Sequence, residues 1–224
     1  MKKLSRRLEA LVEHCDGEYQ HIWDMCCDHG YLGMTLIEKH PSANIHFVDI
    51  VPSLTKEVSS SLERFFAQDS ARLHVSCQDV VNAPLSEFAG STLVVIAGVG
   101  GELMMSMITA LREKHAHRNV DFLLCPVNET YLLRRQLSKL NLNKLKETLV
   151  EDGGRYYEVI KVSTQNGINL SLFGDDIWQH EQSLRYSRQL VTHYEQRMRN
   201  DVDKWADCLN GYQEINASLT ANKK

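Results

Sequence analysis

The sequence predicts a doubly wound α/β fold with a mostly parallel sheet, an antiparallel edge hairpin and a small helical region at its C-terminal end. Short apolar runs alternate with stretches of helical periodicity over roughly the first 140 residues. Most of these runs are almost continuously apolar, as is typical of parallel strands that helices cover on both faces. A chain of 224 residues can form one such core and a modest appendage.

The expected elements follow one another in order. An N-terminal helix is predicted by Leu4, Leu8 and Leu11, which recur at helical spacing. Strands are expected at 21–27, 45–50, 72–79, 92–98 and 120–126. Helices are expected at 32–40, from 52 to about 68, at 102–114 and at 128–140. Pro41 ends the first of these helices and Pro52 begins the second, both favoured positions for proline.

The remainder of the chain predicts a hairpin and then a helical region. The segments LKETLVEDG and GRYYEVIKVS meet at Asp152-Gly153-Gly154, a strong signal for a tight turn between antiparallel strands. The polar segment 165–174 predicts a linker. From Asp175 onward apolar residues recur three or four apart, which predicts either one long helix or a helical hairpin, coiled-coil-like in pattern. We therefore expect a main domain over 1–165 and a helical region over 175–224.

Composition excludes several classes of protein. The net charge of −4 argues against broad polyanion binding, although a local basic patch can still bind RNA. The six cysteines lack the paired spacing of a zinc site, so we expect reduced thiols, no metal and a cytoplasmic location. No apolar run approaches the ~20 residues that span a membrane. Glu9 and Glu13 also interrupt the apolar core that a signal peptide needs.

Chemically informative residues stand at the ends of four successive strands. The first strand ends in the pattern D-x-x-x-D-H-G-Y, from Asp24 to Tyr31, and Asp49 ends the second. Asp79 follows the third strand, and the glycine-rich corner 98–101 follows the fourth. The carboxyl ends of strands in a doubly wound sheet border the crevice where ligands bind. These residues therefore define the candidate site.

The residue types at these positions fit an adenosine-containing cofactor. Asp49 can accept both ribose hydroxyls, Asp79 can accept from an adenine amino group, and Gly30 allows close approach to a helix N-terminus. Each feature also has a simpler interpretation, because an aspartate after a strand is often a helix cap and glycines often serve a turn. The first strand lacks the G-x-G-x-x-G that binds a pyrophosphate. S-adenosylmethionine is therefore favoured over NAD.

Three segments carry a resemblance to a known family: DMCCDHGYLG, VVIAGVGGELM and VEDGGRYYEVI. They resemble the D-x-G-S-D-H-x-Y-L-P, I-A-G-M-G-G and E-D-G-x-x-Y-E motifs of the bacterial tRNA (adenine(22)-N1)-methyltransferase family, in the same order. The resemblance covers about residues 3–175 and includes the start LSRRLE. It implies a Rossmann-like class I methyltransferase domain, S-adenosyl-L-methionine as cofactor, and transfer of a methyl group to N1 of an adenine in tRNA.

The resemblance also implies roles for individual residues. Those implied to bind the cofactor or shape its site are Asp24, Asp28, His29, Gly30, Asp49, Gln78, Asp79, Ala97, Gly98, Gly100 and Gly101. Asp28 and Tyr31 are implied to lie near the target base. Our hypothesis is that Asp28 stabilises the positive charge that develops on the base and that Tyr31 stacks on it or shapes the pocket.

The chain departs from the family pattern at several positions. Cys26-Cys27 replaces Gly-Ser, and Gly33 replaces a proline. An extra tyrosine precedes Glu158 in the hairpin motif. The family's Q-P-N after the fifth strand reads Cys125-Pro126-Val127-Asn128, so the glutamine is absent and the asparagine comes one residue late. These departures are consistent with a divergent branch that has a different RNA target.

Two groups of cations are candidates for contacts with tRNA phosphates. They are Lys2, Lys3, Arg6 and Arg7 on the first helix and Arg134, Arg135 and Lys139 on the helix after the fifth strand. Each of them taken singly is better explained as part of a solvated helix face, whereas grouped cations beside a strand-end cleft favour phosphate contacts. Two other functions stay open: a methyltransferase for a small molecule or a protein, and a non-catalytic module that binds S-adenosylmethionine or RNA.

Overall fold

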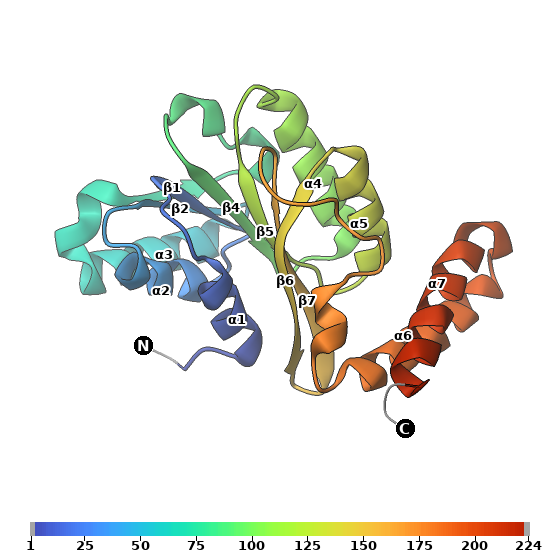
Figure 1. Cartoon of the computed structure of the whole chain (residues 1–224). Helices are drawn as coiled ribbons and strands as arrows, with labels where there is room; N and C mark the ends of the chain where they lie inside the picture. The colour runs from blue at the N-terminus through green and yellow to red at the C-terminus, as the bar shows by residue number, and fades with distance from the viewer. Residues whose placement is uncertain (1–2, 222–224) are drawn as a thin grey trace.

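Seven strands form one sheet in the computed structural model, which describes residues 3–221 (Figure 1). The strands are β1 (His21–Met25), β2 (Asn44–Asp49), β3 (Leu73–Cys77), β4 (Thr92–Ala97), β5 (Asp121–Cys125), β6 (Asn143–Asp152) and β7 (Arg155–Ser163). Their order across the sheet is β3-β2-β1-β4-β5-β7-β6. The pairs among β1 to β5 are parallel, and β7 is antiparallel to both β5 and β6. The predicted fold class is confirmed.

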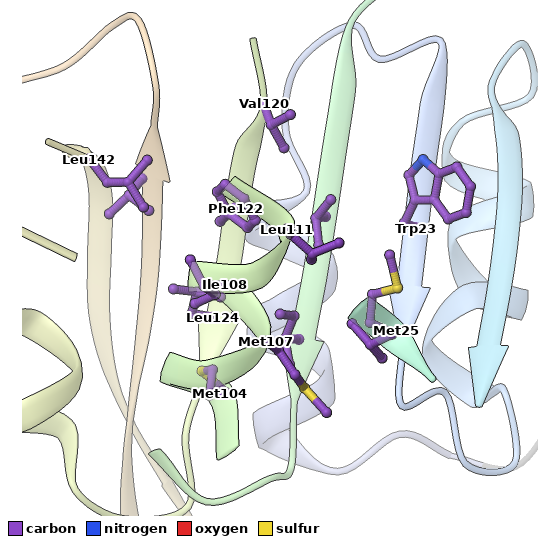
Figure 2. Packing of buried hydrophobic residues seen from close by; sticks show 14 of the residues in the cluster. Trp23, Met25, Met104, Met107, Ile108, Leu111, Val120, Phe122, Leu124 and Leu142 are labelled. Atoms are coloured by element: carbon purple, nitrogen blue, oxygen red, sulfur yellow. The ribbon is translucent and has the colours of Figure 1, made fainter. Parts of the chain in front are cut away.

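Helices cover both faces of this sheet. They are α1 (Arg6–His14), α2 (Tyr31–Lys39), α3 (Pro52–Phe65), α4 (Gly101–Lys114) and α5 (Thr130–Lys139). Short 3-10 turns are η1 (Ala67–Arg72), η2 (Val80–Asn82), η3 (Leu85–Glu87) and η4 (Asp176–Gln179). Figure 2 shows Met104, Ile108 and Leu111 of α4 packed over the strands, in a cluster that also holds residues of α5. The cluster on the other face holds residues of α1, α2 and α3.

Burial explains why the strands read as continuous apolar runs. All five residues of β1 are buried, as are five of the six in β4. β1 ends at Met25, two residues earlier than predicted, because Cys26 adopts a left-handed backbone with φ 56°. Chain order along the sheet reverses between β1 and β4, and that reversal opens a crevice at the carboxyl ends of these strands.

The edge hairpin forms as the sequence predicts. Gly153 and Gly154 connect β6 to β7 with φ of 59° and 77°, values that glycine adopts without steric penalty. Two successive left-handed residues give the turn that matches the right-handed twist of antiparallel strands. The hairpin pairs Asp152 with Arg155 at its turn and extends beyond the parallel part of the sheet (Figure 1).

Two helices, α6 (Ser183–Met198) and α7 (Val202–Ala221), pack side by side after the sheet. The C-terminal region is therefore a helical hairpin. Its core is aromatic: the rings of Tyr194 and Tyr212 stack with centroids 5.4 Å apart, and Tyr131 of α5 joins them. The expected linker 165–174 packs against the sheet edge, where the Lys144 N–H donates to the Ile168 carbonyl at 2.7 Å. None of the helices within residues 3–221 is long and apolar enough to cross a membrane.

Arg134 does not lie on the surface, where the sequence predicts it. Its side chain is fully buried, and its Nη2 lies 2.7 Å from Glu147 Oε2 and 2.6 Å from Glu158 Oε2. The Tyr186 hydroxyl of α6 also donates to Glu158, at 2.8 Å. A buried guanidinium between two carboxylates does not reach a tRNA phosphate, so the predicted phosphate contact of Arg134 is wrong. The residue instead joins α5, both hairpin strands and the C-terminal helices.

Candidate active site

A cavity of about 380 Å³ lies at the crevice between the carboxyl ends of β1, β2 and β4. Its lining residues are Arg7, Leu8, Asp24, Cys26, Cys27, Asp28, His29, Tyr31, Leu32, Asp49, Val51, Leu54, Ala97, Gly98 and Val99. Seven of the residues predicted for the cofactor and the target base are among them: Asp24, Asp28, His29, Tyr31, Asp49, Ala97 and Gly98. The fold thus brings three of the four strand-end features into one site.

Asp24 is the more deeply buried of the two buried acids in this site. It lies in β1 and is 4% exposed, and its Oδ2 accepts a hydrogen bond from the Gly33 N–H at 2.9 Å. The pKa of its carboxyl is raised to about 7, mainly by burial; the hydrogen bond from Gly33 lowers it, and the nearby Asp49 and Asp28 add smaller increases. A carboxyl with that pKa is half ionised near neutral pH, so a cation bound beside it favours the charged form.

Gly33 is matched to Asp24 by both space and hydrogen bonding. A Cβ at this position would lie 2.3 Å from the ring of Phe47 and 2.8 Å from Asp24 Oδ2. Proline, the family's residue here, has no N–H to donate to the carboxylate. The sequence shows this position only as a departure from the motif. The structure shows that the departure supplies a hydrogen bond to the buried acid.

Asp49 holds the turn that follows β1. Its Oδ2 accepts from the Asp28 N–H and its Oδ1 from the Val51 N–H, both at 3.0 Å. Asp28 and Cys26 have φ of 51° and 56°, which is uncommon for residues other than glycine. This backbone leaves the Asp28 side chain 71% exposed at the rim of the cavity. Asp49 therefore serves the site's geometry and still offers free lone pairs to a ligand hydroxyl.

The outer rim is formed by the start of α2. His29 Nδ1 lies 3.1 Å from Glu57 of α3, and its ring centroid is 5.7 Å from that of Tyr31. Gly30 caps α2 with φ 70°, and a Cβ there would lie 3.0 Å from the Val58 side chain. Asp28, His29 and Tyr31 thus form one polar edge of the cavity. Gly30 lies between them and packs against Val58 of α3.

The glycine corner forms the opposite wall. Gly98 lines the cavity with φ 80°, and its N–H donates to the Cys125 carbonyl at 3.1 Å. Gly101 begins α4, where its N–H donates to Asn128 Oδ1 at 3.1 Å. A Cβ on Gly101 would lie 2.7 Å from the Asn128 carbonyl oxygen. Gly100 and Gly101 therefore do not line the cavity themselves, and they allow the corner to pack closely on the loop after β5.

Comparison with known proteins shows the family. The model of a methyltransferase domain matches residues 4–160. The chain belongs to this methyltransferase domain family. A proposed tRNA methyltransferase of Mycoplasma pneumoniae is 28% identical over 141 residues, which are 63% of this chain and 62% of that protein.

Solved structures share the methyltransferase fold over nearly the whole chain. The m1A22 tRNA methyltransferase TrmK of B. subtilis superposes with a TM-score of 0.76 at 21% identity, covering 96% of this chain and 100% of that one. M. capricolum TrmK in complex with S-adenosyl-homocysteine gives 0.76 at 14% identity, covering 97% and 98%. A proposed m1A22 methyltransferase of Streptococcus pneumoniae in complex with S-adenosyl-L-methionine gives 0.75 at 19% identity, covering 96% and 100%. The coverage includes the C-terminal helices.

Two predicted residues of this methyltransferase domain lie just outside the cavity. The Gln78 N–H donates to the Asp49 carbonyl at 2.9 Å, which places the end of β3 beside the end of β2. The Asp79 carboxylate accepts from the Val81 N–H at 3.1 Å and caps η2. The simpler interpretation, an aspartate that caps a helical turn, is therefore what the structure shows for Asp79. Contact of either residue with a cofactor stays a prediction.

The predicted phosphate contacts of the methyltransferase domain separate into different environments. Arg7 lines the cavity and lies over the ring of Tyr157, with its guanidinium carbon 5.1 Å from the ring centroid. Arg6 is exposed and lies 3.9 Å from Glu151. The remaining described candidates, Lys3, Arg135 and Lys139, are exposed, and Lys2 lies outside the described residues. Among the described candidates, Arg7 is thus the cation that lines the cavity.

Proposed function

We propose that this methyltransferase uses S-adenosyl-L-methionine to methylate N1 of an adenine in tRNA. The observation that carries the proposal is the cavity at the strand-order reversal, with the buried Asp24 and Asp49 on one side and the glycine corner on the other. The likeness to solved m1A22 tRNA methyltransferases over almost the entire chain, helical hairpin included, supports the choice of substrate. A cytoplasmic location belongs to the same proposal.

The residues of the cavity fit the proposed cofactor. S-adenosyl-L-methionine carries two positive charges near neutral pH, and Asp24 is a buried carboxyl that forms no ion pair with any residue between 3 and 221. Asp49 can accept the ribose hydroxyls with the lone pairs that its two backbone bonds leave free. Val51 and Leu54 supply an apolar wall for the adenine. A volume of about 380 Å³ is also within the range of small-molecule sites.

The cofactor, when bound, supplies a methyl group already activated by its sulfonium. The protein's own task is to position the acceptor, because adenine N1 carries a free lone pair and needs no proton removed. We assign to the exposed Asp28 carboxylate the stabilisation of the positive charge that develops on the base. Tyr31 flanks the base from the start of α2. N1 is on the Watson–Crick edge, so the adenine must be unpaired when it enters.

The cations place the tRNA relative to this site. We propose that Arg7 contacts a phosphate next to the target nucleotide, and that Lys3, Arg6, Arg135 and Lys139 contact the backbone farther away. Each phosphate contact releases counterions, so tRNA affinity should fall steeply as salt rises. Replacing Arg6 by alanine should reduce that salt dependence, and replacing Arg7 should in addition lower turnover.

Transfer of labelled methyl groups to bulk tRNA, followed by nucleoside analysis, tests the proposal. We expect the label in N1-methyladenosine. The Asp28→Ala variant should lose turnover and keep most of its affinity for S-adenosylhomocysteine, since Asp28 lies at the rim rather than in the buried part of the cavity. Label in another nucleoside, or none despite cofactor binding, would overturn the choice of substrate and direct the search to small molecules and proteins.

A further inference from the structure

The glycine corner of the active site is held in place by the loop between β5 and α5. Asn128 Oδ1 accepts from the Gly101 N–H at 3.1 Å, and a Cβ on Gly100 would lie 3.2 Å from the same oxygen. A second bond runs from the Val127 N–H to the Val99 carbonyl at 3.0 Å. The Asn128 side chain thus satisfies one of the free N–H groups at the start of α4. Any shift of this loop must move the cavity wall.

The next residue of the loop is anchored from outside the sheet. Glu129 adopts φ 57° at the N-terminal end of α5, a backbone that a tertiary contact must hold for a residue of this type. Its Oε1 forms an ion pair with Nη2 of Arg197, which belongs to α6. The glutamate side chain is only 11% exposed, and its Oε2 accepts no hydrogen bond from any residue between 3 and 221. The charge of Arg197 therefore offsets the desolvation penalty of this mostly buried carboxylate.

Arg197 is itself fixed by the helical hairpin. Its guanidinium carbon lies 4.7 Å from the ring centroid of Trp205, which is buried in α7. Trp205 and Tyr194 belong to the same aromatic cluster as Tyr131, two residues beyond Glu129 in α5. The hairpin is consequently docked on the start of α5 by apolar packing as well as by the ion pair.

We propose that Arg197 is a positioning residue for methyl transfer, acting through Glu129 and Asn128 on the glycine corner. Loss of its charge would leave a mostly buried carboxylate without a partner, and the side chain of Glu129 would turn toward water. Because Asn128 precedes Glu129 directly, its bond to Gly101 would loosen with it. The C-terminal hairpin thus holds one wall of the active site, in addition to any contact it makes with tRNA. The turnover part of this inference rests on the proposed function.

A surface arginine on α6 could also act simply as a phosphate contact, and Arg188 provides the matched control. It lies on the same helix, is exposed, and forms no ion pair with a described residue. Replacing it removes a cation from the same helix without touching Glu129, so any effect that comes from surface charge alone should appear in this variant too. Replacing Arg197, which is 35% exposed, should act on the active site even in the absence of tRNA.

The experiment compares R197A, R197K, E129Q and R188A in the full-length chain. Hydrogen exchange of a peptide spanning residues 97–105 is measured without tRNA, together with the Kd for S-adenosylhomocysteine, kcat, and the KM for tRNA. We expect R197A and E129Q to raise exchange at the corner and lower kcat about tenfold, with the KM for tRNA changing less than about twofold. R197K should restore part of kcat, and R188A should leave both kcat and exchange at residues 97–105 at their wild-type values.

The double variant R197A/E129Q tests whether the two residues act through the same ion pair. If the two residues act through one ion pair, combining the substitutions should cost no more than either alone. Unchanged exchange at residues 97–105 in R197A and E129Q, with only the KM for tRNA raised, would overturn the proposal. If the wild-type chain transfers no methyl group to tRNA, the proposed substrate fails, and the exchange data without tRNA still decide whether Arg197 positions the corner.

Discussion

Replacing Asp24 with asparagine should stabilise the folded chain at neutral pH and lower its affinity for the cofactor. Burial raises the pKa of this carboxyl from 3.8 to about 7. At about 1.4 kcal/mol for each tenfold change in an equilibrium, ionising it in the folded chain costs roughly 4 kcal/mol more than in the unfolded chain. Asparagine has the same shape, keeps an oxygen for the Gly33 N–H, and carries no charge.

The sign of the pH dependence follows from the raised pKa. Well below pH 4 the carboxyl is protonated in both the folded and the unfolded chain, so its burial does not reduce stability. Between pH 4 and 7 the unfolded chain releases its proton while the folded chain retains it, so wild-type stability falls as pH rises and levels off above 7. From pH 5 to pH 8 the stability advantage of D24N should therefore grow by roughly 2–3 kcal/mol. For a chain of this length that is a relative rise in Tm of about 5–10 °C.

Two assays check this prediction. Thermal unfolding of the wild type and D24N at pH 5 and pH 8, without cofactor, measures the change in stability. Calorimetric titration with S-adenosylhomocysteine should show wild-type affinity rising from pH 6 to pH 8 and D24N binding at least about tenfold more weakly, since the ligand's ammonium favours the ionised carboxyl. A stability difference that is the same at both pH values would refute the reasoning, and equal affinities would remove Asp24 from the cofactor site.

Three further substitutions test the local structure. Cys26→Gly should leave stability unchanged or raise it by about 1 kcal/mol, because glycine adopts the φ of 56° at this position without steric strain. Cys27 is buried and its backbone is not left-handed, so Cys27→Gly should lower the urea midpoint. Gly33→Ala should lower the free energy of unfolding by about 1–3 kcal/mol, because its Cβ would overlap Phe47. Gly33→Pro should lower it further, since proline also removes the N–H. Equal urea midpoints for the wild type and both variants would contradict this. Burial lowers the pKa of His46 to about 3, so the folded chain becomes less stable as the unfolded histidine takes up a proton, and Tm should fall as pH drops from 6.5 toward 3. The fall should be smaller in His46→Leu. Parallel Tm profiles for the two proteins would exclude His46 as the cause.

The sheet and the position of the site were predictable because they depend on patterns that the chain carries locally. The lengths of the strands, their continuous apolar runs and the acids at successive strand ends are all visible in the sequence. The reversal of strand order then brings Asp24, Asp49 and Gly98 to one cavity. The helical periodicity of the last 50 residues likewise indicated helices. It did not distinguish one helix from two, because the break at 199–201 contains neither proline nor glycine.

The environment of single charged residues was not predictable in the same way. Arg134 and Arg135 are neighbours on one helix, yet the first is fully buried and the second is exposed. Glu147 and Glu158, which capture Arg134, lie 13 and 24 residues farther along the chain, on strands whose pairing decides where they point. The sequence of α5 itself contains no signal of how β6 and β7 pair. A cation on an amphipathic helix therefore becomes a credible phosphate ligand only when its tertiary partners are known.

The departures from the family motif gain a physical meaning once they are placed around Asp24. Gly33 adds an N–H that bonds to the carboxylate and so opposes the rise of its pKa, which proline could not do. Cys26 lines the cavity and occupies a left-handed position that glycine would adopt without strain. Asn128, one residue late in the motif, caps α4 rather than facing the cavity. The site can thus keep its acid, its turn and its glycine corner while the residues that support them change.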